Sequence, residues 1–112
     1  MTTDGGALPD CILIDDDPLV HMTWKIAARE KGKLLRTFSS REEFLAAAAD
    51  IVRSTPIYID SNLGNAVKGE TVAEELYALG YTELYLATGY VAERFTKMTW
   101  LKGVIGKEPP WA

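Results

Sequence analysis

The stretch "CILIDDDPLV", residues 11–20, decides how the rest of the chain is interpreted. A short apolar run passes directly into three consecutive aspartates, a proline and further apolar residues. The apolar run predicts a buried strand, and Asp-Pro ahead of a periodic apolar segment is typical of a helix start. Because neighbouring carboxylates repel one another, something must compensate three of them at the end of a strand. Water is one answer, and a cation is the other.

Strand-like and helix-like segments alternate along the whole chain. Strands are predicted at residues 11–15, 33–38, 56–60, 83–88 and 103–106, each a short run rich in Ile, Leu, Val or Tyr. Helices are predicted between them: one from Asp17 and Pro18 to a stop at Gly32, one opened by Ser40 of "SREE", one over about Glu70 to Leu79, and one marked by Val91, Phe95 and Met98. Such alternation predicts an α/β domain in which helices cover both faces of a parallel, doubly wound sheet, giving three layers.

The first predicted helix carries two adjoining apolar stripes. Leu19, Met22 and Ile26 form one of them, and Val20, Trp24 and Ala27 form the other. Helical periodicity places each set on a common face, and both are candidates for contact with the sheet.

Length and composition bound the class of protein. The chain has 112 residues, enough for one domain, and 12 Lys and Arg against 16 Asp and Glu give a net charge of −4. No basic cluster suggests nucleic-acid binding, and no apolar run reaches the length of a signal sequence or a membrane span. The single cysteine, Cys11, excludes an internal disulfide and is expected to be buried and inert. A cytoplasmic protein is therefore predicted, with a flexible N-terminal tail at 1–8, a domain at 9–107 and a short tail at 108–112.

Chemically useful side chains stand at the ends of the predicted strands. Parallel strands bring their carboxyl ends to one edge of a sheet, where open α/β folds bind ligands. The residues gathered there would be Asp15, Asp16, Asp60, Thr88 and Lys107. Three carboxylates suit Mg²⁺, or Mn²⁺, which would also answer the question of charge compensation. An ammonium and a hydroxyl beside them suit a phosphoryl group.

These motifs together resemble the receiver domain of response regulators in two-component signalling. The motifs "DDD", "YID", "LATG" and "GK" fall in the order and at the intervals of that family over residues 9 to 107. The resemblance implies a flavodoxin-like sheet with strand order 2-1-3-4-5. It implies Asp60 as phosphoacceptor, Thr88 and Lys107 as partners of the phosphoryl group, and a metal held by Asp15, Asp16, Asp60 and the main-chain carbonyl of Asn62.

The same resemblance implies an activity and partners. A carboxylate oxygen of Asp60 would attack the phosphohistidine of a sensor histidine kinase or phosphotransfer protein and form an acyl phosphate. The domain would be a self-phosphorylating switch of a phosphorelay more than a turnover enzyme. The chain could also be a segment of a larger protein such as a hybrid kinase.

The chain departs from the family pattern at several positions. Gly64 stands where the family usually has a proline, so the loop after Asp60 is expected to be longer and softer. Val104 replaces an aromatic residue of many relatives, and Glu108 replaces the proline after Lys107. The sequence then reads "KEPPWA", with no fifth helix. An apolar strip of the sheet would otherwise face water, so we expect a second copy, a partner protein or the Trp111 tail to cover it.

Two other functions are compatible with the sequence. The chain could be a receiver-like interaction module that is poorly phosphorylated or not phosphorylated. Alternatively, Asp15 and Asp17 match the "DxD" motif of haloacid-dehalogenase phosphatases. That family needs a further acidic motif after the lysine, and Asp60 would have no role in its mechanism. His21 lacks a companion with metal-ligand spacing and is interpreted as a surface or boundary histidine.

Overall fold

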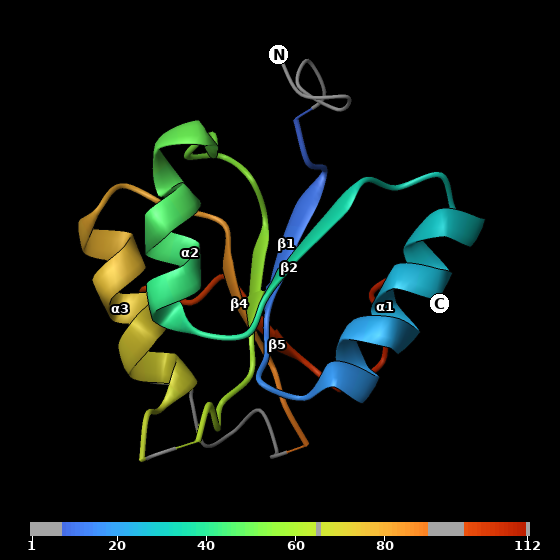
Figure 1. The fold of residues 1–112 in the computed structure, drawn as a ribbon. Helices are drawn as coiled ribbons and strands as arrows, with labels where there is room; N and C mark the ends of the chain where they lie inside the picture. The colour runs from blue at the N-terminus through green and yellow to red at the C-terminus, as the bar shows by residue number, and fades with distance from the viewer. Residues whose placement is uncertain (1–7, 65, 90–97, 112) are drawn as a thin grey trace.

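A five-stranded parallel sheet forms the middle layer of the molecule (Figure 1). The computed structural model describes residues 8–64, 66–89 and 98–111. The strands, β1 (Cys11–Ile14), β2 (Leu35–Phe38), β3 (Ile57–Ile59), β4 (Leu84–Ala87) and β5 (Gly103–Ile105), lie in the order β2-β1-β3-β4-β5. Both the α/β class and the 2-1-3-4-5 order predicted from the sequence are confirmed.

Capping residues set where the helices begin and end. In α1 (Pro18–Glu30), the Asp17 side chain accepts a hydrogen bond from the Leu19 N–H, and Gly32 adopts a left-handed φ of 68° just after the helix. In α2 (Arg41–Ala47), Ser40 accepts from the Glu43 N–H, as the "SREE" motif predicts. A 3₁₀ turn, η1 (Ala48–Asp50), follows α2, and α3 (Gly69–Ala78) precedes β4.

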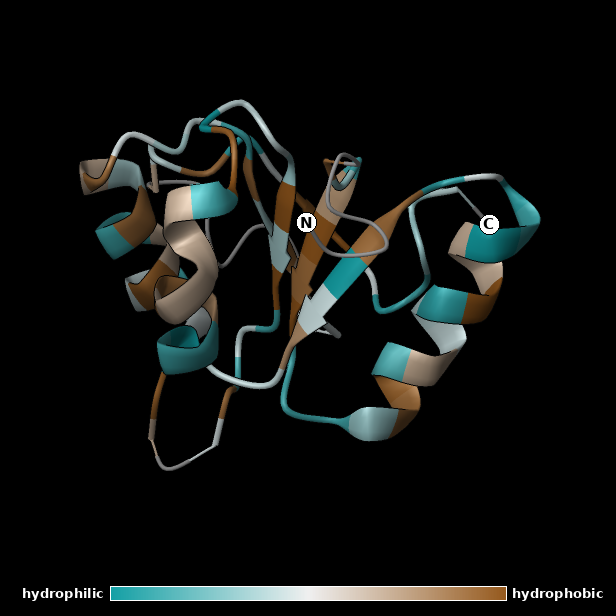
Figure 2. Ribbon diagram, turned by 45° about the horizontal axis from the view of Figure 1, so that its top comes forward, coloured by the Kyte–Doolittle hydropathy of each residue, from teal (hydrophilic) through white to brown (hydrophobic). Residues whose placement is uncertain are grey.

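The two faces of the sheet are covered unequally. Helices α2 and α3 lie on one side and α1 on the other (Figure 1). Strand residues alternate between these sides, so that Ile12 and Ile14 join the cluster beneath α2 and α3 whereas Leu13 points toward α1. Figure 2 shows strands that are mainly hydrophobic between helices in which hydrophilic and hydrophobic residues alternate.

The structure resolves which stripe of α1 faces the sheet. Trp24 and Ala28 are fully buried and Val20 packs against the same cluster, whereas Leu19, Met22 and Ile26 are 68%, 57% and 50% exposed. The periodicity alone could not separate these two stripes, because both are apolar.

Some predicted boundaries shift by one or two residues. The predicted strand at 33–38 begins only at Leu35, because the Lys33 N–H still bonds to the Ala28 carbonyl of α1 and the Leu34 N–H bonds to the Asp10 side chain. Most of the predicted fourth helix, including Val91 and Phe95, lies outside the described residues. Met98 is described and packs against the cluster under α2 and α3 without being helical.

The C-terminal residues lie against α1. Trp111 packs edge-on against Trp24, with ring centroids 5.7 Å apart, and belongs to the apolar cluster on that face of the sheet. Of the three coverings expected from the sequence, the structure shows the tail folding back (Figure 1). Residues 106–111 contain no helix. Within the described chain, no helix combines the length and apolarity needed to cross a bilayer.

Candidate functional site

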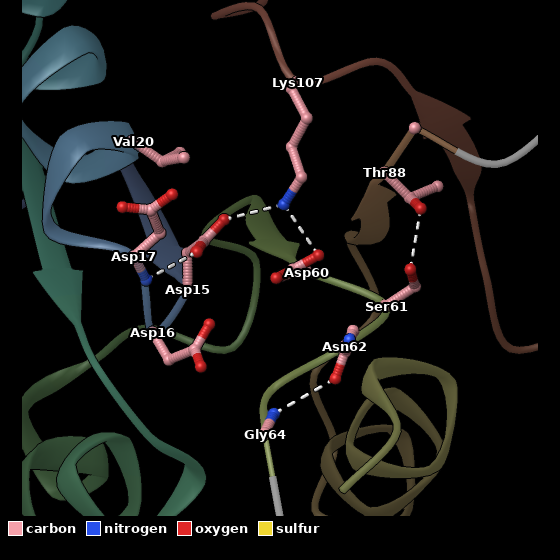
Figure 3. A pocket seen from close by; sticks show the side chains of 11 residues that line it. Asp15, Asp16, Asp17, Val20, Asp60, Ser61, Asn62, Gly64, Thr88 and Lys107 are labelled. Atoms are coloured by element: carbon pink, nitrogen blue, oxygen red, sulfur yellow. Dashed lines mark hydrogen bonds and ion pairs between the residues drawn. The ribbon is translucent and has the colours of Figure 1, made fainter. Parts of the chain in front are cut away.

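The predicted site residues meet in one cavity at the carboxyl edge of the sheet (Figure 3). Asp15 follows β1, Asp60 follows β3, Thr88 follows β4, and Lys107 comes two residues after β5. The cavity has a volume of about 540 Å³, and its lining includes these four residues together with Asp16. Parallel topology alone accounts for this convergence of residues that are up to 92 positions apart.

Lys107 bridges the two buried carboxylates. Its Nζ lies 2.6 Å from Asp60 Oδ1 and 2.9 Å from Asp15 Oδ2 (Figure 3). Asp15 is completely buried, and its other oxygen accepts the main-chain N–H of Asp17 at 2.9 Å. The ammonium therefore offsets a charge repulsion that burial would otherwise make costly.

Burial and ion pairing shift the pKa values of this pair. Burial raises the pKa of Asp60 above its usual value, and the hydrogen bond from Lys107 only partly opposes this rise. For Lys107, burial lowers the pKa, but hydrogen bonds to Asp60 and Asp15 outweigh it, so that the pKa is raised overall. The two shifts are compatible because one ammonium faces two carboxylates. Lys107 is thus held as a cation beside an aspartate whose charge is less favoured than in water.

The carboxylates also satisfy the donor chemistry of a divalent cation. Asp15, Asp16 and Asp60 each offer an oxygen, and these three atoms lie within 4.8 Å of one another. Asp15 and Asp60 are buried while Asp16 is exposed, so that a cation could keep some of its water ligands, as Mg²⁺ prefers. Asn62 lines the same cavity, and the role of its main-chain carbonyl as a ligand stays a prediction.

The loop between β3 and α3 is tied more closely than the sequence suggested. An isolated antiparallel bridge joins Asn62 to Lys68, and the Leu63 and Val67 main chains bond at 3.0 Å. The Gly69 N–H bonds to the Ser61 carbonyl, and a Cβ at Gly69 would lie 1.9 Å from the Asp60 carbonyl oxygen. Only glycine permits this approach of α3 to the end of β3. Cross-loop hydrogen bonds thus join the described residues on the two sides of the loop, and the softness expected from the sequence stays a prediction.

Ser61 is a site residue that the sequence interpretation missed. Its Oγ lies 2.6 Å from Thr88 Oγ1, and both side chains are buried (Figure 3). This bond links the residue after Asp60 to the hydroxyl at the end of β4. A lone serine gives no signal in the sequence, because its partner is 27 residues away and is fixed only by the strand pairing.

His21 also touches the site from outside. Its ring Nε2 is hydrogen-bonded to the main-chain carbonyl of Asp15, and the residue is half-buried. The interpretation as a boundary histidine agrees with this position. The ring contacts the backbone of the β1–α1 connection, so it supports the shape of the connection that carries Asp16.

Comparison with known proteins places this architecture. No protein-family model matches the sequence, and no curated protein matches it. Among solved structures, a CheY-like response regulator receiver domain protein from Methanospirillum hungatei JF-1 superposes with a TM-score of 0.74 over 90% of this chain and 82% of its own, at 18% identity. This chain has the receiver-domain fold.

Two further receiver domains agree with this assignment. The receiver domain of the PhyR response regulator from Erythrobacter litoralis matches with a TM-score of 0.69 and 19% identity, over 92% of this chain and 81% of its own. The signal receiver domain of a modulated diguanylate cyclase from Desulfovibrio desulfuricans G20 matches with a TM-score of 0.70 and 26% identity, over 94% and 84%. The receiver-domain fold thus extends over nearly the whole chain.

Proposed function

We propose that this receiver domain accepts a phosphoryl group on Asp60 within a two-component or phosphorelay system. The observation that carries the proposal is the Asp60 carboxylate in the cavity, 2.6 Å from the Lys107 ammonium and grouped with Asp15 and Asp16. A nucleophile, a fixed cation and a cluster of metal-type ligands within one cavity are the parts that phosphoryl transfer requires.

These positions support the following reaction. One oxygen of Asp60 attacks the phosphorus of a phosphohistidine, an O–P bond forms as the N–P bond breaks, and the imidazole leaves after taking a proton from solvent. Lys107 would stabilise the negative charge on the phosphoryl oxygens, and the Thr88 hydroxyl, which lines the same cavity, would donate a hydrogen bond to one of them. Asp15, Asp16 and Asp60, with the carbonyl of Asn62, would hold Mg²⁺, which supplies further positive charge at the phosphoryl group.

The donor in this proposal is a sensor histidine kinase or phosphotransfer protein. The exposed stripe of Leu19, Met22 and Ile26 starts at the first turn of α1, directly after the acidic residues that line the cavity. Exposed apolar side chains grouped on one helix face favour contact with another protein. A partner bound there would lie next to the cavity that contains Asp60.

The test is the intact mass of the protein after incubation with acetyl phosphate, with Mg²⁺ and with EDTA. The native chain should gain one phosphoryl group with Mg²⁺, and Asp60→Asn should gain none. Asp50→Asn, at an exposed aspartate, is the matched control and should behave like the native chain. A gain that persists in Asp60→Asn would overturn the assignment of the acceptor.

A contact-only module is the second candidate, and the exposed stripe on α1 favours it equally. No mass gain in a folded protein that binds Mg²⁺ would select this alternative. The interpretation as a haloacid-dehalogenase phosphatase has less support. The carboxylate of Asp17, the second aspartate of its "DxD" motif, caps α1, and the carboxylate paired with Lys107 at 2.6 Å is that of Asp60, which has no role in that family.

A further inference from the structure

A buried indole links α1 to the main chain of the cavity lysine. Trp24 Nε1 donates a hydrogen bond to the Lys107 carbonyl oxygen at 2.9 Å, across 83 positions of sequence. The same residue therefore presents its ammonium to Asp60 and Asp15 and its carbonyl to Trp24.

Lys107 lies beyond the end of the sheet, between the exposed Gly106 and Glu108, with the buried Pro109 two residues further on. The sheet ladder ends with the bond between the Thr88 N–H and the Ile105 carbonyl, and Gly106 then separates the strand from Lys107. The next residue is Glu108, so no proline ring restricts the backbone at that position. A lysine carries its ammonium on a flexible stem of four carbons. The position of the ammonium therefore depends on where the main chain at the base of this stem is held.

The donor, in contrast, is held firmly. Trp24 is 0% exposed and packs between Tyr58, with ring centroids 5.4 Å apart, and Trp111, with centroids 5.7 Å apart. A buried indole N–H without an acceptor costs free energy, because it has lost its hydrogen bonds to water and gained none in the protein. The hydrogen bond from Trp24 to the Lys107 carbonyl is therefore expected to persist.

We infer that Trp24 is a positioning residue for Lys107, whose indole N–H fixes the main chain from which the ammonium reaches Asp60. This role rests on the proposed phosphoryl transfer for its effect on rate, but the position of the ammonium can be measured without any phosphoryl donor. Trp24 is not among the residues that line the cavity, so that its effect on the reaction would pass through Lys107.

Trp24→Phe tests the role, because it removes the N–H and keeps an aromatic ring. Trp100→Phe is the matched control, since Trp100 Nε1 also donates to a main-chain carbonyl, that of Glu70 at 3.1 Å, on the other face of the sheet. Phosphorylation by acetyl phosphate should slow about tenfold in Trp24→Phe, as expected for a misplaced charged group, and by less than about twofold in Trp100→Phe.

If Trp24 acts by positioning Lys107, the effect of Trp24→Phe on the rate should disappear when Lys107 is removed, whereas a general loss of structure would still slow the reaction. In a Lys107→Ala background, Trp24→Phe should change the rate by less than about twofold, because the group it positions is gone. Equal slowing in the two tryptophan variants, or undiminished slowing by Trp24→Phe without Lys107, would overturn the inference.

Two measurements keep the test independent of the proposed function and of folding. The ¹⁵N-correlated signal of the Lys107 ammonium should be present in the native chain and Trp100→Phe and lost or shifted in Trp24→Phe, even if no phosphoryl group is ever accepted. In the unmodified chain, the Trp24 indole proton should exchange slowly with deuterium. An ammonium signal unchanged by Trp24→Phe, or rapid exchange of that indole, would contradict the role of Trp24.

Discussion

The two faces of the sheet differ in how they are held together. Beneath α2 and α3, a large cluster of buried aliphatic and aromatic side chains joins β1, β2, β3 and β4 to the helices, and the partly buried Val104 of β5 packs against it. On the α1 face, the buried cluster consists of Leu13, Trp24 and Ala87, with partly buried side chains that include Tyr58 and Trp111 packed against it, and Ala28 of α1 is buried as well. The first face is built for stability, whereas the second is thin and connects by hydrogen bond to the cavity residue Lys107.

The largest loss of stability is expected when a buried side chain beneath α2 and α3 is truncated. Phe44 is fully buried and packs edge-on against Phe38 and Tyr81, with ring centroids 5.5 Å apart in each pair. Phe44→Ala should lower the free energy of unfolding by about 3–5 kcal/mol, as large-to-small changes in a core do. Urea denaturation would measure it, and a loss below about 1 kcal/mol would show that this face is not the main source of stability.

A smaller loss is expected from the thinner face. Trp111→Ala removes a half-buried ring from the α1 face and exposes Trp24. The free energy of unfolding should fall by about 1–2 kcal/mol, in proportion to the smaller apolar area lost. Trp24 should then become more accessible to a collisional quencher such as acrylamide. A loss equal to that of Phe44→Ala would remove the contrast between the faces.

The ion pair between Asp60 and Lys107, in the cavity at the sheet edge shared by the two faces, can be tested by measuring the pKa of Asp60. In the metal-free protein, the carboxyl of Asp60 should titrate above the value of about 3.9 for an exposed aspartate, because burial disfavours its charge. Lys107→Met should raise this pKa further, since removing a nearby positive charge disfavours the carboxylate. Carboxyl ¹³C shifts followed by NMR would report both changes. A fall of the Asp60 pKa in the variant would contradict the ion pair.

The smallest effect is expected at Ser61. Ser61→Ala removes its hydrogen bond to Thr88 and should lower the free energy of unfolding by about 1 kcal/mol. The rate of phosphorylation should stay within about twofold of the native rate, because the acceptor and Lys107 are untouched. Thermal unfolding and the acetyl phosphate assay would measure the two effects. Abolished phosphorylation would instead assign Ser61 a direct part in the reaction.

Local patterns were enough to predict most of the fold. The caps at Asp17 and Ser40 and the stop at Gly32 lie where the sequence signals place them, because capping depends on residues close in sequence. The convergence of Asp15, Asp60, Thr88 and Lys107 was predictable too, since it follows from parallel strand order.

What the sequence could not predict depends on tertiary contacts. Two equally apolar stripes on α1 differ only in which one meets the sheet. The bonds from Ser61 to Thr88 and from Trp24 to Lys107 join residues 27 and 83 positions apart. Nothing in the local composition of either partner marks these pairs. The close approach of α3 to Asp60, which requires glycine at position 69, is likewise a tertiary contact that the local sequence does not reveal.

The proposed function depends most on Asp60 as the residue that carries the phosphoryl group. Its most direct test is to phosphorylate the native chain with acetyl phosphate and Mg²⁺, reduce the acyl phosphate with borohydride, and map the peptides by mass spectrometry. Homoserine should appear at position 60, with Asp15 and Asp16 unchanged. Homoserine at another aspartate, with position 60 intact, would contradict it.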